Sequence, residues 1–369
     1  MEPFVRPFQS GDMREIVGLL EEVFKGWPHL DLGCSSLDHW KWKYLDNPLG
    51  EAVISVACDG DRIVGVNHSY PLRIKIGDSI HASSFAADTA VHADYRGLGL
   101  SVEMIEQGIR SRREKGTKFT YFVTRHPRLI RMNSKRYPSF PRSITSLVRI
   151  RDIDCHLEAM PMDRAFLLKL GFKGAKFVNQ LKHRSEKNVS GSIRISDVES
   201  FDERIDLLWD KVALEGDFSV ERRREYLNWR YCDPRSGGFK IRLAVEGSDI
   251  VGYSVLRINR FNKSYPIGYI VDLFAPPRRL DVLNALASDA AVYFDDSDVN
   301  IVNCLAVKGR QLNNVLAVQG FLDSRVKMHL FYLAEGIGNN LAHMRSSKPN
   351  SIYFGYGDID SLPVQMAHH

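Results

Sequence analysis

The sequence lacks several features that would fix its class at once. It contains no run of ~18 apolar residues, so it offers no membrane-spanning helix and we expect no membrane partner. Its N-terminus shows no basic start followed by an apolar stretch, so we expect no secretory signal and a cytoplasmic location. Cysteine is scarce and no CxxC pair occurs, which predicts free thiols and no metal site. The five cysteines are Cys34, Cys58, Cys155, Cys232 and Cys304.

A large excess of charge of one sign is also missing. A net charge of +5 on 369 residues is mild and does not by itself indicate a nucleic-acid partner. The 44% of hydrophobic and 26% of charged residues are ordinary for a globular protein, which excludes a disordered or collagen-like chain. With ~150 residues per domain as a guide, the length predicts two domains rather than one.

Three short segments recur in the same order along the chain. The matching pairs are 42–48 with 229–234, 60–65 with 247–252, and 88–91 with 272–275. The first two pairs lie 187 positions apart and the third lies 184 apart. Three aligned pairs at nearly one offset indicate two copies of one fold in tandem.

Both copies predict the same order of elements. Each opens with an amphipathic helix, at 16–23 and at 205–212, and a second helix then carries a Trp-Lys/Arg-Tyr element. In the first copy we predict strands at 54–58, 63–70, 72–76, 85–91 and 119–124, with a helix at 98–115 before the last of them.

We therefore divide the chain into four parts. They are an N-terminal module at 1–150, a helical linker at 151–192, a C-terminal module at 193–335 and a tail at 336–369. The linker predicts a helix at 164–181, and the tail predicts an added strand at 352–358.

The most informative stretch follows a predicted strand and opens a predicted helix. It reads Val91-His-Ala-Asp-Tyr-Arg96-Gly97-Leu98-Gly99-Leu100-Ser101. A helix start exposes unpaired N–H groups and the positive end of a dipole, which together favour an anion. Gly97 and Gly99 let a ligand approach the backbone, and Arg96 can neutralise a phosphate. An ordinary strand-to-helix turn would also explain a lone Gly-x-Gly, and both the Walker and the Rossmann glycine patterns are missing.

This stretch resembles the acetyl-CoA signature of the GNAT N-acetyltransferase superfamily, Arg/Gln-x-x-Gly-x-Gly/Ala. Arg96, Gly99 and Ser101 occupy the patterned positions, and Ser101 departs from the usual Gly or Ala. The order of elements in both copies is also similar to that fold. The resemblance implies an α+β protein of two tandem GNAT-like modules, each a mixed, mostly antiparallel sheet flanked by helices.

The resemblance also implies acetyl-CoA as co-substrate. Backbone amides of the signature loop would hold its pyrophosphate, and the strand near Val91 would pair with its pantetheine arm. The implied cofactor-binding residues are Val91, Arg96, Gly97, Leu98, Gly99, Leu100 and Ser101.

The second copy has a different sequence at the matching position. It reads Pro276-Pro-Arg-Arg-Leu280, without either glycine, and its two prolines remove two amide donors. We infer a single cofactor site, in the N-terminal module, and a C-terminal module that walls the substrate cleft.

Acetyl transfer to an amine needs a base for the amine proton and gains from an acid that protonates the departing thiolate. The resemblance makes Asp88 the candidate base, although Asp272 at the matching place in the second copy favours a shared structural role. His126, just past the last strand of the first copy, is an alternative base. Tyr137 falls roughly where the superfamily carries its acid tyrosine, with packing as the alternative role.

Six basic residues lie close together after the strand at 119–124. They are Arg125, Arg128, Arg131, Lys135, Arg136 and Arg142. They form either a solvated surface or a site that captures CoA phosphates or an anionic acceptor such as a nucleotide-linked sugar. No aromatic platform accompanies them, so we expect no nucleic-acid partner. We interpret the repeated Trp-Lys/Arg-Tyr elements mainly as core packing.

Together these features predict an acetyl-CoA-dependent N-acetyltransferase that acts on a small polar amine. An amino sugar or a nucleotide-linked amino sugar is the first hypothesis for this small-molecule acceptor. The alternatives are an aminoacyl-transferring relative that uses charged tRNA, and a non-catalytic CoA-binding scaffold.

Overall fold

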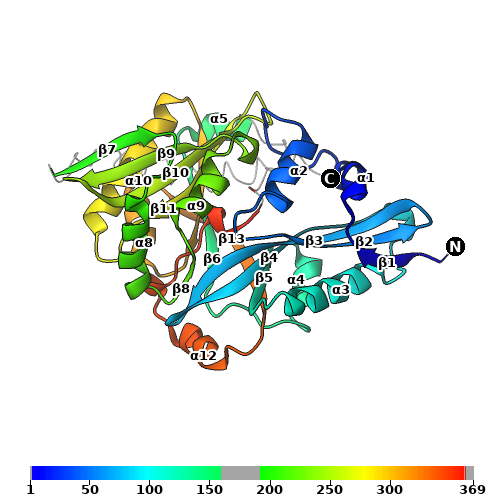
Figure 1. Ribbon diagram of the computed structural model, residues 1–369. Helices are drawn as coiled ribbons and strands as arrows, with labels where there is room; N and C mark the ends of the chain where they lie inside the picture. The colour runs from blue at the N-terminus through cyan, green and yellow to red at the C-terminus, as the bar shows by residue number, and fades with distance from the viewer. Residues whose placement is uncertain (1, 159–191, 361, 363–369) are drawn as a thin grey trace.

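The computed structural model describes residues 2–158, 192–360 and 362. The helix predicted at 164–181 lies outside the described residues. Figure 1 shows the sheet crossing the molecule, with the N-terminal strands at one end and the strands of the second copy at the other. None of the described helices is both long and apolar enough to cross a membrane.

Five strands form the N-terminal half of the sheet, and helices cover both of its faces. The strands are β1 (Phe4–Pro7), β2 (Val53–Asp59), β3 (Arg62–Ile76), β4 (Ser79–Val91) and β5 (Phe119–Thr124). The helices are α1 (Met13–Phe24), α2 (Ser36–Tyr44), α3 (Leu100–Glu114) and α4 (Pro127–Asn133), with 3-10 turns η1 (Ser10–Asp12) and η2 (Ala93–Tyr95). Helices α1 and α2 lie on one face, and α3 and α4 lie on the other (Figure 1).

The strands predicted separately at 63–70 and 72–76 form the single strand β3. Pro71 is tolerated within it because β2 pairs with β3 only as far as Ser69, so one side of β3 has no neighbouring strand at Pro71. The carbonyl of Pro71 accepts a hydrogen bond from the Asn47 side chain on that side. A proline that needs no ladder donor therefore does not end the strand.

The second half repeats this arrangement. Its strands are β7 (Ile193–Val198), β9 (Lys240–Glu246), β10 (Asp249–Asn259), β11 (Ile267–Phe274) and β12 (Ile301–Val307), with a short β8 (Phe218–Val220) that pairs with β3. Its helices are α8 (Arg204–Glu215), α9 (Arg224–Leu227), α10 (Leu280–Asp296) and α11 (Gln311–Val318), with turns η3 (Asn228–Cys232) and η4 (Pro234–Ser236). Before the linker lies α5 (Ile153–Glu158).

The two halves exchange their last strands. The order across the sheet is β1-β2-β3-β4-β5-β13-β6-β12-β11-β10-β9-β7. Strand β6 (Ile144–Ile150) follows the N-terminal strands in sequence yet pairs with β12, and β13 (Leu322–Ala334) pairs with β5. Replacing each strand by its counterpart in the other copy reverses this order, so the sheet has two-fold pseudosymmetry. The fold is α+β with two tandem modules, and the module boundaries proposed above assign each module a last strand that lies in the sheet of the other.

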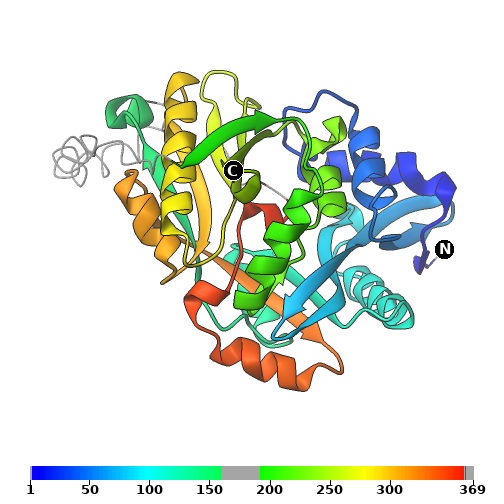
Figure 2. The same ribbon diagram turned by 60° about the vertical axis from the view of Figure 1, so that its left-hand side comes forward.

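The prediction of a strand at 352–358 is wrong. After α12 (Gly338–Ser346) and the turn η5 (Pro349–Ser351), the chain runs extended and then forms the 3-10 turn η6 (Tyr356–Asp358). Side chains satisfy its backbone: the Asp358 carboxylate accepts from the Gly355 amide, and Tyr121 donates to the Asp358 carbonyl. Apolar alternation resembled a strand, but its aromatic side chains are buried between the two halves, where the segment is seen in red in Figure 2.

Candidate functional site

Strands β4 and β5 diverge in the middle of the N-terminal half. They pair in parallel only from Ser83 with Phe119 to Phe85 with Tyr121. Beyond these pairs β4 continues to Val91 and β5 to Thr124 without a further pairing recorded between them in the described chain. A splay of this kind leaves main-chain donors and acceptors of both strands available to an extended ligand.

The loop after β4 carries the glycines singled out above. Gly97 and Gly99 have φ angles of 87° and 86°, in the left-handed region that favours glycine. A Cβ placed on Gly97 would meet nothing within 4 Å, and one on Gly99 would meet only the Glu103 side chain at 4.0 Å. The loop is therefore open on its outer side, with room for a ligand against the backbone.

The start of α3 points unpaired amides into this opening. Within the described chain, no backbone hydrogen bond is recorded for the N–H groups of Gly97 through Ser101. The Leu100 side chain is buried and anchors the turn, whereas Arg96 is exposed and bonds through Nε to the Val91 carbonyl. Consecutive free amides at a helix N-terminus suit a diphosphate, so the residues present fit the cofactor that the resemblance implies.

The corresponding place in the second half is filled by the chain itself. Strands β11 and β12 also stop pairing, after Ile270 and Cys304. The Tyr353 hydroxyl donates to the carbonyl of Ala275, the counterpart of Val91, at 2.7 Å. The Arg310 guanidinium lies 4.2 Å above the Tyr353 ring. An aromatic side chain thus occupies the position that a ligand arm would need.

Asp88 lies at a bulge of β4 and faces α2. Its φ is 39°, and its carboxylate accepts from Lys43 Nζ at 2.6 Å and from the Tyr44 hydroxyl at 2.5 Å. Burial alone would raise the pKa of Asp88, but the Lys43 ammonium and the hydrogen bonds from Lys43 and Tyr44 outweigh burial and lower it. A carboxylate held this way is a strong anchor for Lys43 and a weak proton acceptor.

A second carboxylate, which the sequence did not single out, completes this cluster. Asp360 Oδ2 lies 3.1 Å from Lys43 Nζ, which also bonds to Asp88. Burial raises the pKa of Asp360, and Asp88 adds to the effect, while Lys43 opposes it. No sequence motif links the tail to α2, because 317 positions separate the two partners.

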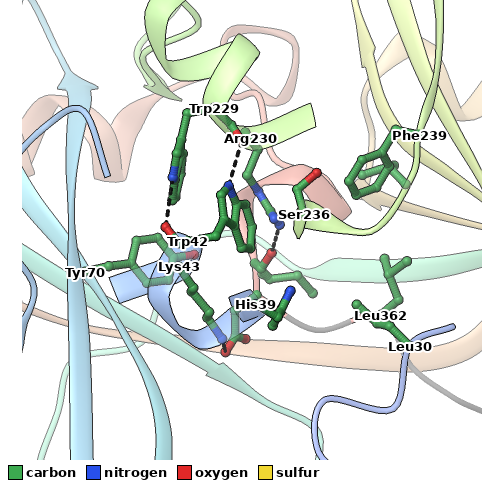
Figure 3. Close-up of a pocket in the computed structure, with 13 residues that line it drawn as sticks. Leu30, His39, Trp42, Lys43, Tyr70, Trp229, Arg230, Ser236, Phe239 and Leu362 are labelled. Carbon is green, nitrogen blue, oxygen red and sulfur yellow. Dashed lines mark hydrogen bonds and ion pairs between the residues drawn. The ribbon is translucent and has the colours of Figure 1, made fainter. Parts of the chain in front are cut away.

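Asp360 lines a narrow hollow between the halves, drawn in Figure 3. The Trp42 and Trp229 indoles lie side by side on one wall, with His39 and Leu30 farther along. The hollow holds about 20 Å³ of free space, room for about one water molecule. Its lining residues include Lys43, Tyr70, Arg230, Ser236, Phe239 and Leu362.

Tyr137 and His126 lie on the opposite face of the sheet, with α4. The half-buried Tyr137 ring packs edge-on against Phe122 with 5.4 Å between centroids, just past the last β4–β5 pair. His126 is exposed at the N-terminus of α4, and its amide bonds to Thr124. The structure therefore does not bring Asp88, Tyr137 and His126 into one cluster: it places Asp88 on the α2 face and the other two on the α4 face.

The basic cluster around α4 is solvent-facing. Five of its cations, all except Arg142, are exposed and form no ion pair among the described residues. Arg142 bonds to the Ser347 carbonyl instead. The repeated Trp-Lys/Arg-Tyr elements are buried at the junction of the halves, as the packing interpretation requires.

Comparison with known proteins agrees with this geometry. Residues 4–132 match the family model described as an acetyltransferase (GNAT) domain, a range that includes the loop from Arg96 to Ser101. No curated protein sequence matches the chain.

Several solved structures share the architecture over most of the chain. A conserved Enterococcus faecalis protein described as a probable N-acyltransferase is 13% identical, with TM-score 0.60 over 90% of this chain and 73% of its own. An N-acetyltransferase of Anabaena variabilis is 14% identical, with TM-score 0.59 over 89% and 72%. Saccharomyces cerevisiae N-myristoyltransferase, solved with myristoyl-CoA, is 12% identical, with TM-score 0.59 over 90% and 81%. At these identities the likeness shows the fold, and the tandem modules described above are GNAT-like. Residues 4–132 thus match a GNAT acetyltransferase domain, and the chain as a whole shares the fold of these solved structures.

Proposed function

We propose that the protein transfers an acetyl group from acetyl-CoA to the amino group of a small polar acceptor. The observation that carries the proposal is the open turn from Arg96 to Ser101, whose free amides stand at the end of the splayed strand β4. Acetyl-CoA would supply the activated thioester when bound there.

The N-terminal module alone would hold the acyl donor. The amides of Gly97 to Ser101 would bind the diphosphate, with Arg96 beside them, and the unpaired edge of β4 near Val91 would bond the pantetheine arm. The exposed cations of α4 would face the remaining phosphate of CoA. The second module cannot offer the same site, because Pro276 and Pro277 lack amides and Tyr353 fills its splay.

The acceptor would approach from the α2 face, with the water-sized hollow of Figure 3 beside its amino group. There the carboxylate of Asp360 would attract an ammonium group, which must lose a proton before its nitrogen can attack the thioester carbonyl. Asp360 would accept that proton, directly or through a water molecule, because its pKa is raised by burial. Asp88, the base expected from the sequence, would hold Lys43 in place. His126 would be the base only if the acceptor entered from the α4 face.

The departing thiolate would take a proton on the other face. Tyr137 packs on Phe122 beside the splay and is the proposed acid there. A base on one face and an acid on the other leave the thioester between them, in the gap between β4 and β5.

The structure affects the two arguments for an amino sugar differently. Attraction of a cationic amine by a carboxylate still supports it, but stacking of a sugar ring on a tryptophan does not. Trp42 and Trp229 stack on each other and are buried, so neither offers a free face to a sugar ring. The Asp360 carboxylate at the hollow would favour a cationic amine, and an amino sugar and many other small amines meet this requirement.

A panel of small amines incubated with the full chain and acetyl-CoA, read by mass spectrometry and by release of the CoA thiol, tests the proposal. We expect amine-dependent thiol release with a product 42 Da heavier, the mass of an acetyl group replacing a hydrogen. Saturating acetyl-CoA should also raise the melting temperature. Cofactor binding without thiol release for any amine would support the scaffold alternative instead.

A further inference from the structure

A cavity of about 510 Å³ lies beyond the C-terminal end of α3, on the same face of the sheet. Residues of β3 between Ser69 and Arg73 and of β4 between Ile80 and Ser84 form the floor. The segment from Leu49 to Glu51 forms one wall, and Lys115 and Thr117 after α3 form the other. A volume of this size is within the range of small-molecule sites.

One side chain in the cavity carries a buried charge without a counter-ion. Arg112, in the last turn of α3, is 6% exposed. Among the described residues its one side-chain hydrogen bond runs from Nη1 to Ser69 Oγ, at 3.2 Å, and no carboxylate pairs with it. Burial lowers the pKa of Arg112 to about 10, against the weaker influence of Tyr137 and Glu335. A guanidinium with five donors and one neutral partner is an unfavourable arrangement unless an anion completes it.

The backbone makes room for this guanidinium. A Cβ on Gly108 would lie 3.1 Å from Arg112 Nη1, closer than ordinary packing allows. Glycine in the middle of a helix costs about 1 kcal/mol of stability relative to alanine. At Gly108 the missing side chain leaves the space that the Arg112 guanidinium occupies.

The other cations of the cavity already have partners. Arg73 pairs with Glu221 at 2.8 Å, and Lys115 pairs with Glu51 at 3.2 Å. The uncompensated positive charge of the cavity is therefore that of Arg112. The Ser69 hydroxyl bonds to it, and Thr117 also lines the cavity.

We propose that this cavity binds a small oxyanion, a carboxylate or phosphate monoester with a short apolar part. The oxyanion would pair with Arg112 and accept from the neighbouring hydroxyls. The apolar part would lie against the side chains that line the rest of the cavity. These are Leu49, Val53, Pro71, Leu72 and Ile80.

This cavity lies apart from the proposed diphosphate turn and from the acceptor hollow. Arg112 lies twelve residues after Leu100, so about 18 Å of helix separates it from the turn at Gly97–Ser101. The cavity borders β4 at Ser83 and Ser84, where β4 and β5 are still paired, so it does not open into the splay. The hollow with Asp360 lies on the other face of the sheet.

Crystals of the full chain soaked in selenate locate the oxyanion by anomalous scattering, and calorimetry measures phosphate, butyrate and hexanoate in solution. All titrations contain saturating acetyl-CoA, so that binding of the probes at the turn Gly97–Ser101 does not contribute to the measured signal. We expect a selenium peak within hydrogen-bond distance of Arg112 and tighter binding of hexanoate than of butyrate. If phosphate binds and the carboxylates do not, the ligand is a phosphate ester.

Arg112→Gln and Arg113→Gln form a matched pair of variants. Arg113 is the next residue, is exposed and pairs with Glu335. We expect Arg112→Gln to weaken probe binding at least about tenfold and Arg113→Gln to leave it within about twofold. Equal effects of both variants, or a wild-type soak without a peak at Arg112, would overturn the proposal. The soak uses the unaltered chain, so the test stands even if Arg112→Gln fails to fold. If acetyl-CoA itself does not bind, the proposed function fails, and the selenate soak still decides this site.

Discussion

Trp42 and Trp229 bond to each other's backbone. The Nε1–H of Trp42 donates to the Trp229 carbonyl at 2.9 Å, and the Nε1–H of Trp229 donates to the Trp42 carbonyl at 3.0 Å. Their rings stack with 5.0 Å between centroids. The two residues are counterparts in the sequence repeat, so they meet at the pseudo-two-fold axis and join the two modules.

The reciprocal bonds predict strong coupling between these two tryptophans. Trp42→Phe removes one donor, leaves the buried Trp229 carbonyl unpaired and creates a small void, so we expect a loss of about 2–4 kcal/mol in the free energy of unfolding. A double-mutant cycle with Trp229→Phe, measured by chemical denaturation, should give a coupling energy of about 1 kcal/mol or more.

Trp209→Phe is the matched control. Trp209 is equally buried, but its indole N–H has no partner in the described structure. The loss of stability caused by Trp209→Phe should simply add to the loss caused by Trp42→Phe, with no coupling energy between them. Additive behaviour of Trp42 and Trp229 as well would mean that the reciprocal bonds contribute nothing specific.

The glycine turn predicts a selective effect on cofactor binding. Gly99→Ala places a Cβ at a φ of 86° and where the diphosphate would approach, so we expect the dissociation constant of acetyl-CoA to rise at least about tenfold. Calorimetric titration of the variant measures it. Gly116→Ala introduces the same kind of backbone strain at a φ of 75°, with no neighbour within 4 Å of the new Cβ, at the far end of α3. It should lower stability and leave acetyl-CoA affinity unchanged. Equal losses of affinity would assign the effect to strain alone.

The sequence predicted much of the fold because the repeat and the local patterns agree with it. Apolar spacing located α1, and glycines located the turn before α3. The sequence could not predict the exchange of β6 and β13, because a strand that pairs in the other module has the same local pattern as a strand that pairs in its own. The strand at 352–358 was predicted wrongly for the same kind of reason: alternation describes which side chains are buried, and the partner of the backbone is not encoded locally.

The site was predicted unevenly. Local main-chain geometry decides the turn at Gly97–Ser101, so the motif could predict the turn itself, and its role in cofactor binding stays a prediction. Asp88 was noticed for its position, but its proton affinity depends on Lys43 and Tyr44 of α2. Asp360 carries no local signal at all, since its role arises from a contact between the tail and α2.

The buried histidines predict an acid-sensitive fold. His68 accepts from Trp40 through Nε2 and bonds to the Asp88 carbonyl through Nδ1, so its ring is neutral. Burial lowers the pKa of His68 to about 4. Between pH 6.5 and 4 the unfolded chain binds a proton that the folded chain does not, so this contribution to stability is lost as the pH falls through that window.

The His68→Gln variant isolates the contribution of His68 to the pH dependence of stability. Asp358, whose pKa burial raises to about 6, acts in the opposite direction over part of the same window, so the useful quantity is the difference between variant and wild type. Their unfolding free energies should converge by up to about 1.4 kcal/mol per pH unit as the pH falls from 6.5 to 4. A constant difference across this window would mean that His68 titrates normally in the folded state.

The filled second splay predicts one acetyl-CoA per chain. Calorimetry of the wild type should give a stoichiometry of one. Tyr353→Phe removes the bond to the Ala275 carbonyl and should cost about 1 kcal/mol of stability without changing that number, because the ring still fills the space. Two molecules bound per wild-type chain would contradict the single-site assignment.

Asp88 and Asp360 share Lys43, but the pKa of Asp88 is lowered and that of Asp360 is raised, which predicts different kinetic roles for the two carboxylates. Asp360→Asn removes the proposed proton acceptor, so kcat should fall by about 10²–10⁴ while KM for acetyl-CoA stays near its wild-type value. The wild-type rate should decline as the pH falls through the raised pKa of Asp360, because the protonated form cannot accept the amine proton, and this decline should disappear in the variant. Asp88→Asn should lower stability and kcat while keeping the pH-dependent decline, since it acts by holding Lys43. An Asp360→Asn enzyme with wild-type kcat and an unchanged pH profile would return the role of base to Asp88 or His126.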